Sequence, residues 1–175
     1  MSIANSPSKP ELLNALHVSG DRVLTTLRAL PAAAFEPVRY DGGWTGHQIL
    51  AHLASIEWTY PRLIDRAKQA AARSGDNHAD ESRRAPHSVR ADDGIDAYNE
   101  RQVTQRAHTS IDVLLEEFAR NRAATITAFE AVDDELLAVS IRSAGKAHGP
   151  LGGVIYRVAI EHVLGHLRDI VGNEG

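Results

Sequence analysis

Four stretches of the chain carry apolar residues at the spacing of an α-helix, and this periodicity constrains the fold more than any other feature. The stretches cover residues 11–30, 44–72, 110–132 and 153–171. Within each of them the apolar side chains recur every three or four positions, so they share one helix face. The sequence contains no pair of strands with a hairpin signal and no internal repeat. The pattern therefore predicts an all-α protein, a four-helix bundle whose apolar faces pack together.

Proline and capping residues indicate where these helices begin and end. Pro31 is expected to stop the first helix, while Thr45 and Ser110 are suitable N-caps for the second and third. Pro61 lies inside the second apolar pattern, where its missing N–H and its ring disfavour a continuous helix. We therefore expect the second helix to kink near Pro61, or to end and start again there.

Two long connections separate the predicted helices. Residues 73–91 are polar and lack any period, which is typical of a long crossover loop. Residues 92–107 have a weaker amphipathic pattern and predict a short extra helix. Residues 133–150 form the second connection, in which the segment LAVSIRS allows at most a short extended piece. A chain of 175 residues with this layout is expected to form a single domain over residues 1–175.

Composition and charge exclude several classes of protein. The net charge is −4 and the lysines and arginines are spread along the chain, whereas nucleic-acid binding needs a concentrated basic face. The chain has no cysteine, so it forms no disulfide and no cysteine-based zinc site. No stretch reaches the ~18 apolar residues of a membrane span, and the chain begins without the apolar region of a signal peptide. We expect a cytoplasmic protein that binds neither nucleic acid nor membrane.

The placement of histidines singles out a candidate site. The chain has nine of them, and His162 and His166 stand one helical turn apart in the last apolar pattern. At ~100° per residue both fall in the centre of the predicted buried stripe. His52 lies on the inner face of the second helix, whereas His47 falls on the opposite side. A bundle can bring inward side chains of facing helices to one point, so these three imidazoles are expected to meet.

Two interpretations fit histidines on an apolar face. A lone histidine is more often a core residue with hydrogen-bond partners. A central pair one turn apart, with a third inward histidine, favours a metal site instead. Three imidazoles bind Zn²⁺, Ni²⁺, Fe²⁺ or Cu²⁺ and leave at least one position open, which is the arrangement of catalytic rather than structural zinc. A water or thiol in that position would ionise near neutral pH and act as a nucleophile.

Two segments resemble the motifs of a known family. The segment GWTGHQILAHLASIE, followed about a hundred residues later by EHVLGHLRDI, resembles the DinB/YfiT-like superfamily of bacterial four-helix-bundle metalloproteins. The matching positions are Trp44, His52, His162 and His166. The resemblance implies a zinc or nickel ion held by the three histidines, and frequent homodimers. It also implies small-molecule chemistry, because relatives include transferases and isomerases that use bacillithiol, mycothiol or glutathione, and some hydrolases.

These observations lead to two hypotheses of different classes. The first is a metal-dependent enzyme acting on a small molecule, as a thiol-dependent transferase or a hydrolase. The missing cysteine is compatible with it, because a low-molecular-weight cosubstrate would supply the thiol. The alternative is a non-catalytic metal-binding or stress-response binding protein of the same fold. A general base inside the pocket would distinguish the two.

Only two carboxylates are candidates for that base. Glu57 lies at the margin of the inner face of the second helix, where a solvated position is the more common outcome. Asp169 shares a face with His166 and would either orient that imidazole or lie exposed at the helix end.

Further polar residues are weaker candidates, since packing or solvation is the usual role of such side chains. His148 precedes the last helix in a glycine-rich loop and is a candidate proton donor. Candidates for the pocket wall are Tyr60, Tyr98, Asn99 and Gln102. Candidates for binding an anionic cosubstrate are Arg83, Arg84 and Arg90.

Overall fold

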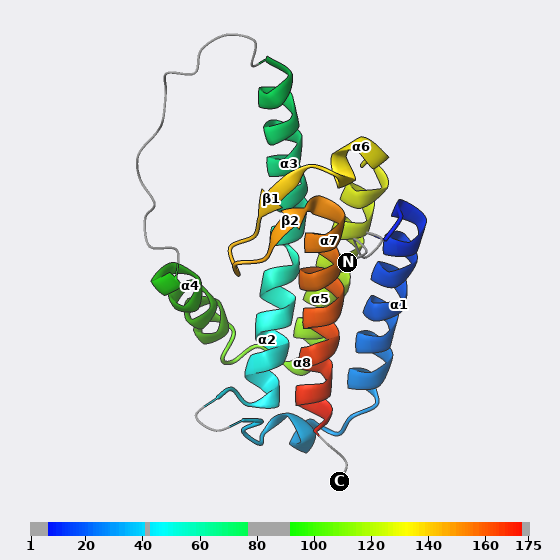
Figure 1. The fold of residues 1–175 in the computed structure, drawn as a ribbon. Coiled ribbons are helices and arrows are strands. Elements are labelled where there is room, and N and C mark those ends of the chain that lie inside the picture. The colour runs from blue at the N-terminus through cyan, green and yellow to red at the C-terminus, as the bar shows by residue number, and fades with distance from the viewer. Residues whose placement is uncertain (1–6, 41–42, 77–91, 173–175) are drawn as a thin grey trace, which may run out of the picture.

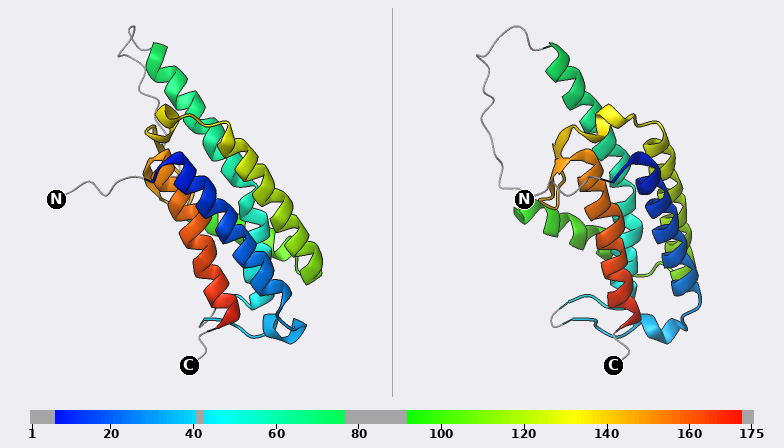
Figure 2. Two further views of the ribbon diagram at one scale, coloured as in Figure 1. Left: turned by 90° about the vertical axis from the view of Figure 1, so that its right-hand side faces the viewer. Right: turned by 45° about the vertical axis from the view of Figure 1, so that its right-hand side comes forward.

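The chain folds as the four-helix bundle that the apolar periodicity predicts (Figure 1). The structure is a computed structural model that describes residues 7–40, 43–76 and 92–172. Further views show the long helices packed side by side (Figure 2). The bundle elements are α1 (Lys9–Arg28), α2 (Gly46–Glu57) with α3 (Thr59–Asp76), α5 (Ile111–Glu130), and a last helix made of α7 (Leu151–Ile155), a π-helical turn (Tyr156–Glu161) and α8 (His162–Val171).

Shorter elements fill the connections. A 3₁₀ turn, η1 (Ala32–Phe35), joins α1 to α2, and α6 (Asp134–Leu137) follows α5. The predicted extra helix is α4 (Asp92–Gln105), which lies beside α2 outside the bundle (Figure 1). The predicted crossover loop starts later than expected, because α3 continues to Asp76. The rest of that prediction, residues 77–91 with Arg83, Arg84 and Arg90, lies outside the described residues.

The predicted N-cap residues, Thr45 and Ser110, lie at the N-termini of α2 and α5. The backbone N–H of Gln48 donates to Thr45 Oγ1 at 3.2 Å, and the Thr45 N–H donates back to Gln48 Oε1 at 2.9 Å. This reciprocal pair satisfies two N–H groups that a helix start otherwise leaves without partners. Ser110 accepts a bond from Val113 N–H at the start of α5.

The helix break near Pro61 is also confirmed. Helix α2 ends at Glu57, and α3 starts again at Thr59. Proline has no N–H to donate to the carbonyl four residues earlier, which here belongs to Glu57. The hydroxyl of Thr125 on α5 donates to that carbonyl instead, at 3.2 Å.

The expectation of no paired strands is wrong at one place. Strands β1 (Ser140–Arg142) and β2 (His148–Pro150) pair antiparallel, with Ile141 opposite Gly149. Two strands of three residues are too short to show the alternation that signals a strand in sequence. The hairpin lies against α3 and α7 (Figure 1). Among the described residues, no helix is both long and apolar enough to cross a membrane.

A layer of buried polar side chains divides the core into two apolar clusters. One cluster lies around α3, α7 and the first half of α1, and the other around α2, α8 and the second half of α1. Between them lie Ser19 from α1, Glu57 from α2, and Arg122 and Thr125 from α5, all buried. Burying charged groups is unfavourable unless they are paired and hydrogen-bonded, so the contacts of this layer decide whether it stabilises the bundle.

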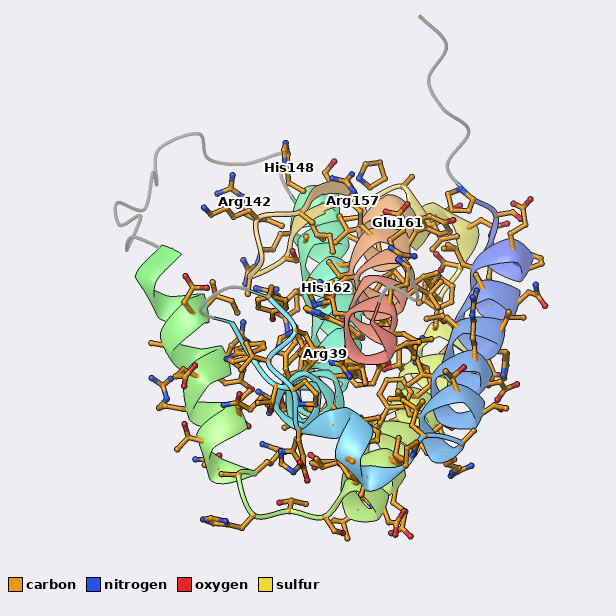
Figure 3. The ribbon with its side chains drawn as sticks, turned by 90° about the horizontal axis from the view of Figure 1, so that it is seen from below. Arg39, Arg142, His148, Arg157, Glu161 and His162 are labelled. Atoms are coloured by element: carbon orange, nitrogen blue, oxygen red, sulfur yellow. The ribbon has the colours of Figure 1, made fainter. Side chains whose placement is uncertain are left out.

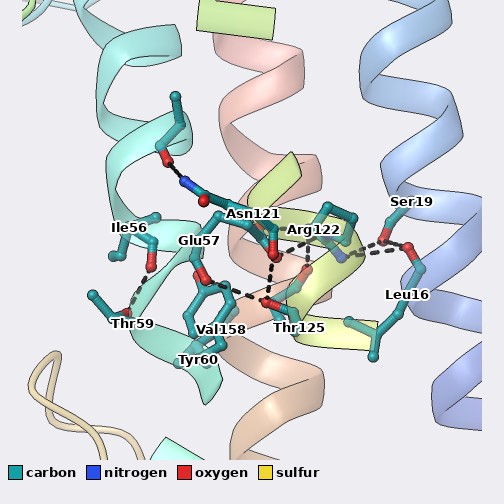
Figure 4. A network of polar contacts seen from close by, with 12 residues as sticks. Leu16, Ser19, Ile56, Glu57, Thr59, Tyr60, Asn121, Arg122, Thr125 and Val158 are labelled. Carbon is teal, nitrogen blue, oxygen red and sulfur yellow. Dashed lines mark hydrogen bonds and ion pairs between the residues drawn. The ribbon is translucent and has the colours of Figure 1, made fainter. Parts of the chain in front are cut away.

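Arg122 connects the four bundle elements through this layer (Figure 4). Its Nε atom lies 2.9 Å from Glu57 Oε1, and Nη2 donates to Glu57 Oε2 at 3.0 Å. Nη1 donates to the Leu16 carbonyl at 3.4 Å and to Ser19 Oγ at 3.3 Å on α1. Nη2 also donates to the Ala159 carbonyl of the last helix at 2.9 Å. The guanidinium is therefore paired with a carboxylate and bonded to every other element of the bundle.

Replacing Arg122 is expected to destabilise the protein strongly. Arg122→Met leaves the Glu57 carboxylate buried without its cation, which typically costs about 3–5 kcal/mol. Chemical denaturation of the wild type and variant measures this difference in the free energy of unfolding. Arg120→Met is the matched control, because Arg120 is exposed on the same helix. Equal effects of the two substitutions would contradict the structural role assigned to Arg122.

Candidate metal centre

His52 approaches the site from α2 and is held there by tight packing. Its side chain is only 2% exposed, because α2 is buried over most of its length. The ring of Trp44 lies 5.0 Å from the His52 ring, measured between centroids. Trp44 Nε1 also donates to Glu100 on α4, at 3.3 Å. The tryptophan that opens the second helix thus fixes one side of this imidazole.

His162 and His166 approach the same point from α8. The Nε2 atoms of His52 and His162 lie 3.2 Å apart. The ring centroids of His166 lie 5.2 Å from His52 and 4.5 Å from His162, and all three ring pairs are nearly perpendicular. One ring nitrogen from each residue lies within 4.8 Å of the other two. In the part of the chain that the structure describes, this is the one such group of three potential metal ligands.

The spacing of these nitrogens fits a metal ion. Two ligands of a tetrahedral zinc ion, each ~2.0–2.1 Å from it, lie about 3.3 Å apart. The separation between His52 and His162 is close to that value. His52 Nδ1 is buried and has no hydrogen-bond partner in the structure. The interpretation of a core histidine with satisfied hydrogen bonds therefore does not describe His52.

Asp169 orients the third imidazole. Its Oδ2 atom lies 3.0 Å from His166 Nδ1. When this nitrogen carries the proton, Nε2 of His166 keeps a free lone pair for a metal ion. The orienting role considered for Asp169 agrees with this geometry.

Burial keeps two of the imidazoles neutral. Desolvation is the main cause that lowers the pKa of His52 to about 3, and the neighbouring histidines lower it further. The pKa of His162 is lowered to about 4, also mainly by desolvation, although the side chain as a whole is exposed toward solvent. We attribute the lowered pKa of His162 to its inward ring nitrogen, which lies against His52. Neutral imidazoles are the form that binds a metal ion.

The predicted buried stripe on the last helix is wrong in its register. The buried residues of α8 are Val163, Leu167 and Ile170, whereas His162 is exposed and His166 is partly buried. A uniform step of ~100° per residue assumes an α-helix throughout. The π-helical turn before His162 inserts an extra residue and rotates everything after it. The two histidines therefore lie beside the buried stripe, toward α2, rather than in its centre.

The position expected for Glu57 is also wrong. Its side chain is fully buried, not solvated at the helix edge, and its ion pair is with Arg122. Burial raises the pKa of Glu57 to about 7, against the opposing effect of the Arg122 guanidinium. The sequence signal for Arg122 was its place between Phe118 and Ile126, which share the inner face of α5. In the same way, Glu57 follows the buried Leu53 of α2 by four residues, which places it on the inner face of that helix.

A cavity of about 700 Å³ opens beside the histidines. His52 and His162 form part of its wall, together with side chains from α3 and α4 and the turn between β1 and β2. Of the candidate wall residues, Tyr60, Tyr98 and Asn99 line the cavity, whereas Gln102 does not and instead accepts a hydrogen bond from Arg106. Neither Glu57 nor Asp169 is among the residues that line it.

The cavity wall has positive charge but, among the described residues, no carboxylate. The arginines that line it are Arg62, Arg66 and Arg157. Figure 3 shows Arg157 nearer the start of the last helix than His162, on the side of the hairpin. His148 is exposed on the hairpin and does not line the cavity. These arginines give no signal in the sequence, because their helix faces become a shared wall only after the hairpin and α4 fold against the bundle.

The fold and sequence are similar to those of known proteins. The family model of the mycothiol maleylpyruvate isomerase N-terminal domain matches residues 16–170. The structure is similar to the crystal structure of the mycothiol-dependent maleylpyruvate isomerase, with a TM-score of 0.70 and 15% sequence identity. That match covers 99% of this chain but 65% of the isomerase, so this chain spans about two thirds of its length.

A second solved structure has the same fold. YfiT from Bacillus subtilis, described as a probable metal-dependent hydrolase with an unusual four-helix bundle topology, matches with a TM-score of 0.65 and 15% identity. The match covers 97% of this chain and 89% of YfiT. No protein with a curated description matches the chain in sequence. At these identities the structural matches establish the fold.

Proposed function

Because the chain belongs to the family of mycothiol maleylpyruvate isomerase N-terminal domains, within the DinB/YfiT-like superfamily, we propose that it is a metal-dependent enzyme acting on a small molecule. His52, His162 and His166 would hold a divalent ion, zinc or nickel. The observation that carries this proposal is the convergence of their ring nitrogens within 4.8 Å beside a cavity of about 700 Å³. Such an ion, when bound, would stabilise the ionised form of a water or thiol at neutral pH.

The residues around the histidines have distinct roles in this proposal. Asp169 would keep the proton of His166 on Nδ1, and Trp44 would hold the ring of His52. The apolar and aromatic wall would exclude water from the reacting group. Arg66 and Arg157 would bind an anionic group of the substrate or cosubstrate, because a guanidinium binds carboxylates and phosphates through paired N–H donors.

The residues that line the cavity limit which groups can take part in the proposed reaction. Neither Glu57 nor Asp169 lines the cavity, so neither can act there directly as a general base. A thiol and a water at the histidine site would both ionise there without a separate base, so the missing carboxylate does not distinguish a thiol-dependent transferase from a hydrolase. The match to the mycothiol maleylpyruvate isomerase N-terminal domain supports the transferase. If the protein binds metal but no small molecule, the alternative of a non-catalytic metal-binding protein is favoured. Homodimer formation remains a prediction.

Metal analysis tests the proposal. Protein purified without a histidine tag is expected to bind close to one equivalent of Zn²⁺ or Ni²⁺ per chain, measured by elemental analysis after dialysis. His162→Ala removes a ligand and should weaken binding by more than the about 10–100-fold that loss of an outer partner costs. His17→Ala is the control, since His17 is exposed on α1. A wild type that takes up neither metal would refute the proposal.

Thiol binding separates the transferase from the hydrolase. We expect mycothiol or glutathione to raise the melting temperature of the zinc-loaded protein, since a ligand at 100 times its Kd adds about 2.7 kcal/mol of stability. The S-methylated form of the same thiol, which cannot ionise at sulfur, should stabilise less. Differential scanning fluorimetry measures both. No stabilisation by either free thiol would count against thiol use and favour hydrolysis.

A further inference from the structure

The π-helical turn at Tyr156–Glu161 sets the direction in which His162 and His166 face. In an α-helix each N–H donates to the carbonyl four residues earlier. The N–H of His162 instead donates to the carbonyl of Arg157, five residues earlier. The turn therefore contains one residue more than an α-helix, which rotates the following residues by ~100°. With a regular α-helix, the face that carries His162 would point away from His52.

Such a turn also changes the hydrogen bonds of the backbone. Where the helix returns from five-residue to four-residue spacing, one carbonyl is left without an N–H partner. Two side chains donate to consecutive carbonyls at this place. The Tyr60 hydroxyl donates to the Val158 carbonyl at 2.6 Å, and Arg122 Nη2 donates to the Ala159 carbonyl at 2.9 Å (Figure 4). A buried carbonyl without a partner is unfavourable, so these donors stabilise the π-helical turn over a regular one.

Both donors are themselves held in place. Tyr60 on α3 and Arg122 on α5 are each only 3% exposed. Glu57 fixes the guanidinium of Arg122 through its carboxylate. Burial, with the nearby Glu57, raises the pKa of Tyr60 well above its ordinary value, so the hydroxyl keeps its proton and remains a donor.

We propose that Tyr60, together with Arg122, is a positioning residue for the histidine site: it holds the π-helical turn and so keeps His162 and His166 directed at His52. This rests on the proposed function, because the site is taken to bind metal. Tyr60 also lines the cavity, but its hydroxyl is already donated to Val158. Its effect on the metal is therefore transmitted through the backbone of the last helix.

Tyr60→Phe tests this role, because it removes the hydroxyl and keeps the ring. We expect about 10-fold weaker Zn²⁺ binding, the lower end of the effect of losing an outer partner, measured by competition with a chromophoric chelator. The visible absorption of the Co²⁺-substituted protein should change as well, since it reports the ligand geometry. Tyr98→Phe is the matched control. Tyr98 lines the same cavity, and its buried hydroxyl has no hydrogen-bond partner in the structure.

The outcomes separate the two proposals. Weaker Zn²⁺ binding and a changed Co²⁺ spectrum in Tyr60→Phe, with both unchanged in Tyr98→Phe, support the positioning role. A lower melting temperature of Tyr60→Phe with unchanged affinity and spectrum shows a purely structural role and overturns it. Equal effects of the two substitutions overturn it as well. A wild type that binds no metal overturns the proposed function and this inference together.

Discussion

The ion pair between Arg122 and Glu57 is the interaction on which the arrangement of the helices depends. Both groups are buried, and a buried charge is tolerated only with full compensation. Arg122 obtains it by contacting α1, α2 and the last helix at once. Sliding any of these helices by one turn would leave a charge or a carbonyl without a partner. The polar layer therefore fixes the relative heights of the helices, which apolar packing alone specifies less strictly.

The same layer connects the core to the histidine site. Arg122 and Tyr60 donate to consecutive carbonyls of the π-helical turn, which directly precedes His162. Helix α2 carries Glu57 five residues beyond His52, so the ion pair also fixes the position of that imidazole along the bundle. Three ring nitrogens can converge within 4.8 Å only if both helices keep their register. The π-helical turn and the buried ion pair together hold the three ring nitrogens at this spacing.

Local signals explain which features the sequence could predict. Thr45 and Pro61 act through backbone groups within four residues, so the ends of α2 followed from the sequence. The three histidines were found because their positions deviate from an apolar pattern on two facing helices. The π-helical turn was not predictable, because its carbonyls are bonded by Tyr60 and Arg122, which are far away in the sequence. Glu57 was misplaced for the same reason, since its partner lies on α5.

The central claim is that His52, His162 and His166 together bind one metal ion. X-ray absorption spectroscopy of the zinc-loaded protein tests it most directly, because imidazole ligands give a characteristic multiple-scattering pattern. We predict Zn–N distances of about 2.0–2.1 Å and the scattering of three imidazoles, reduced to two in His166→Ala. A zinc ion surrounded mainly by oxygen ligands, with a spectrum unchanged by His166→Ala, would contradict the claim.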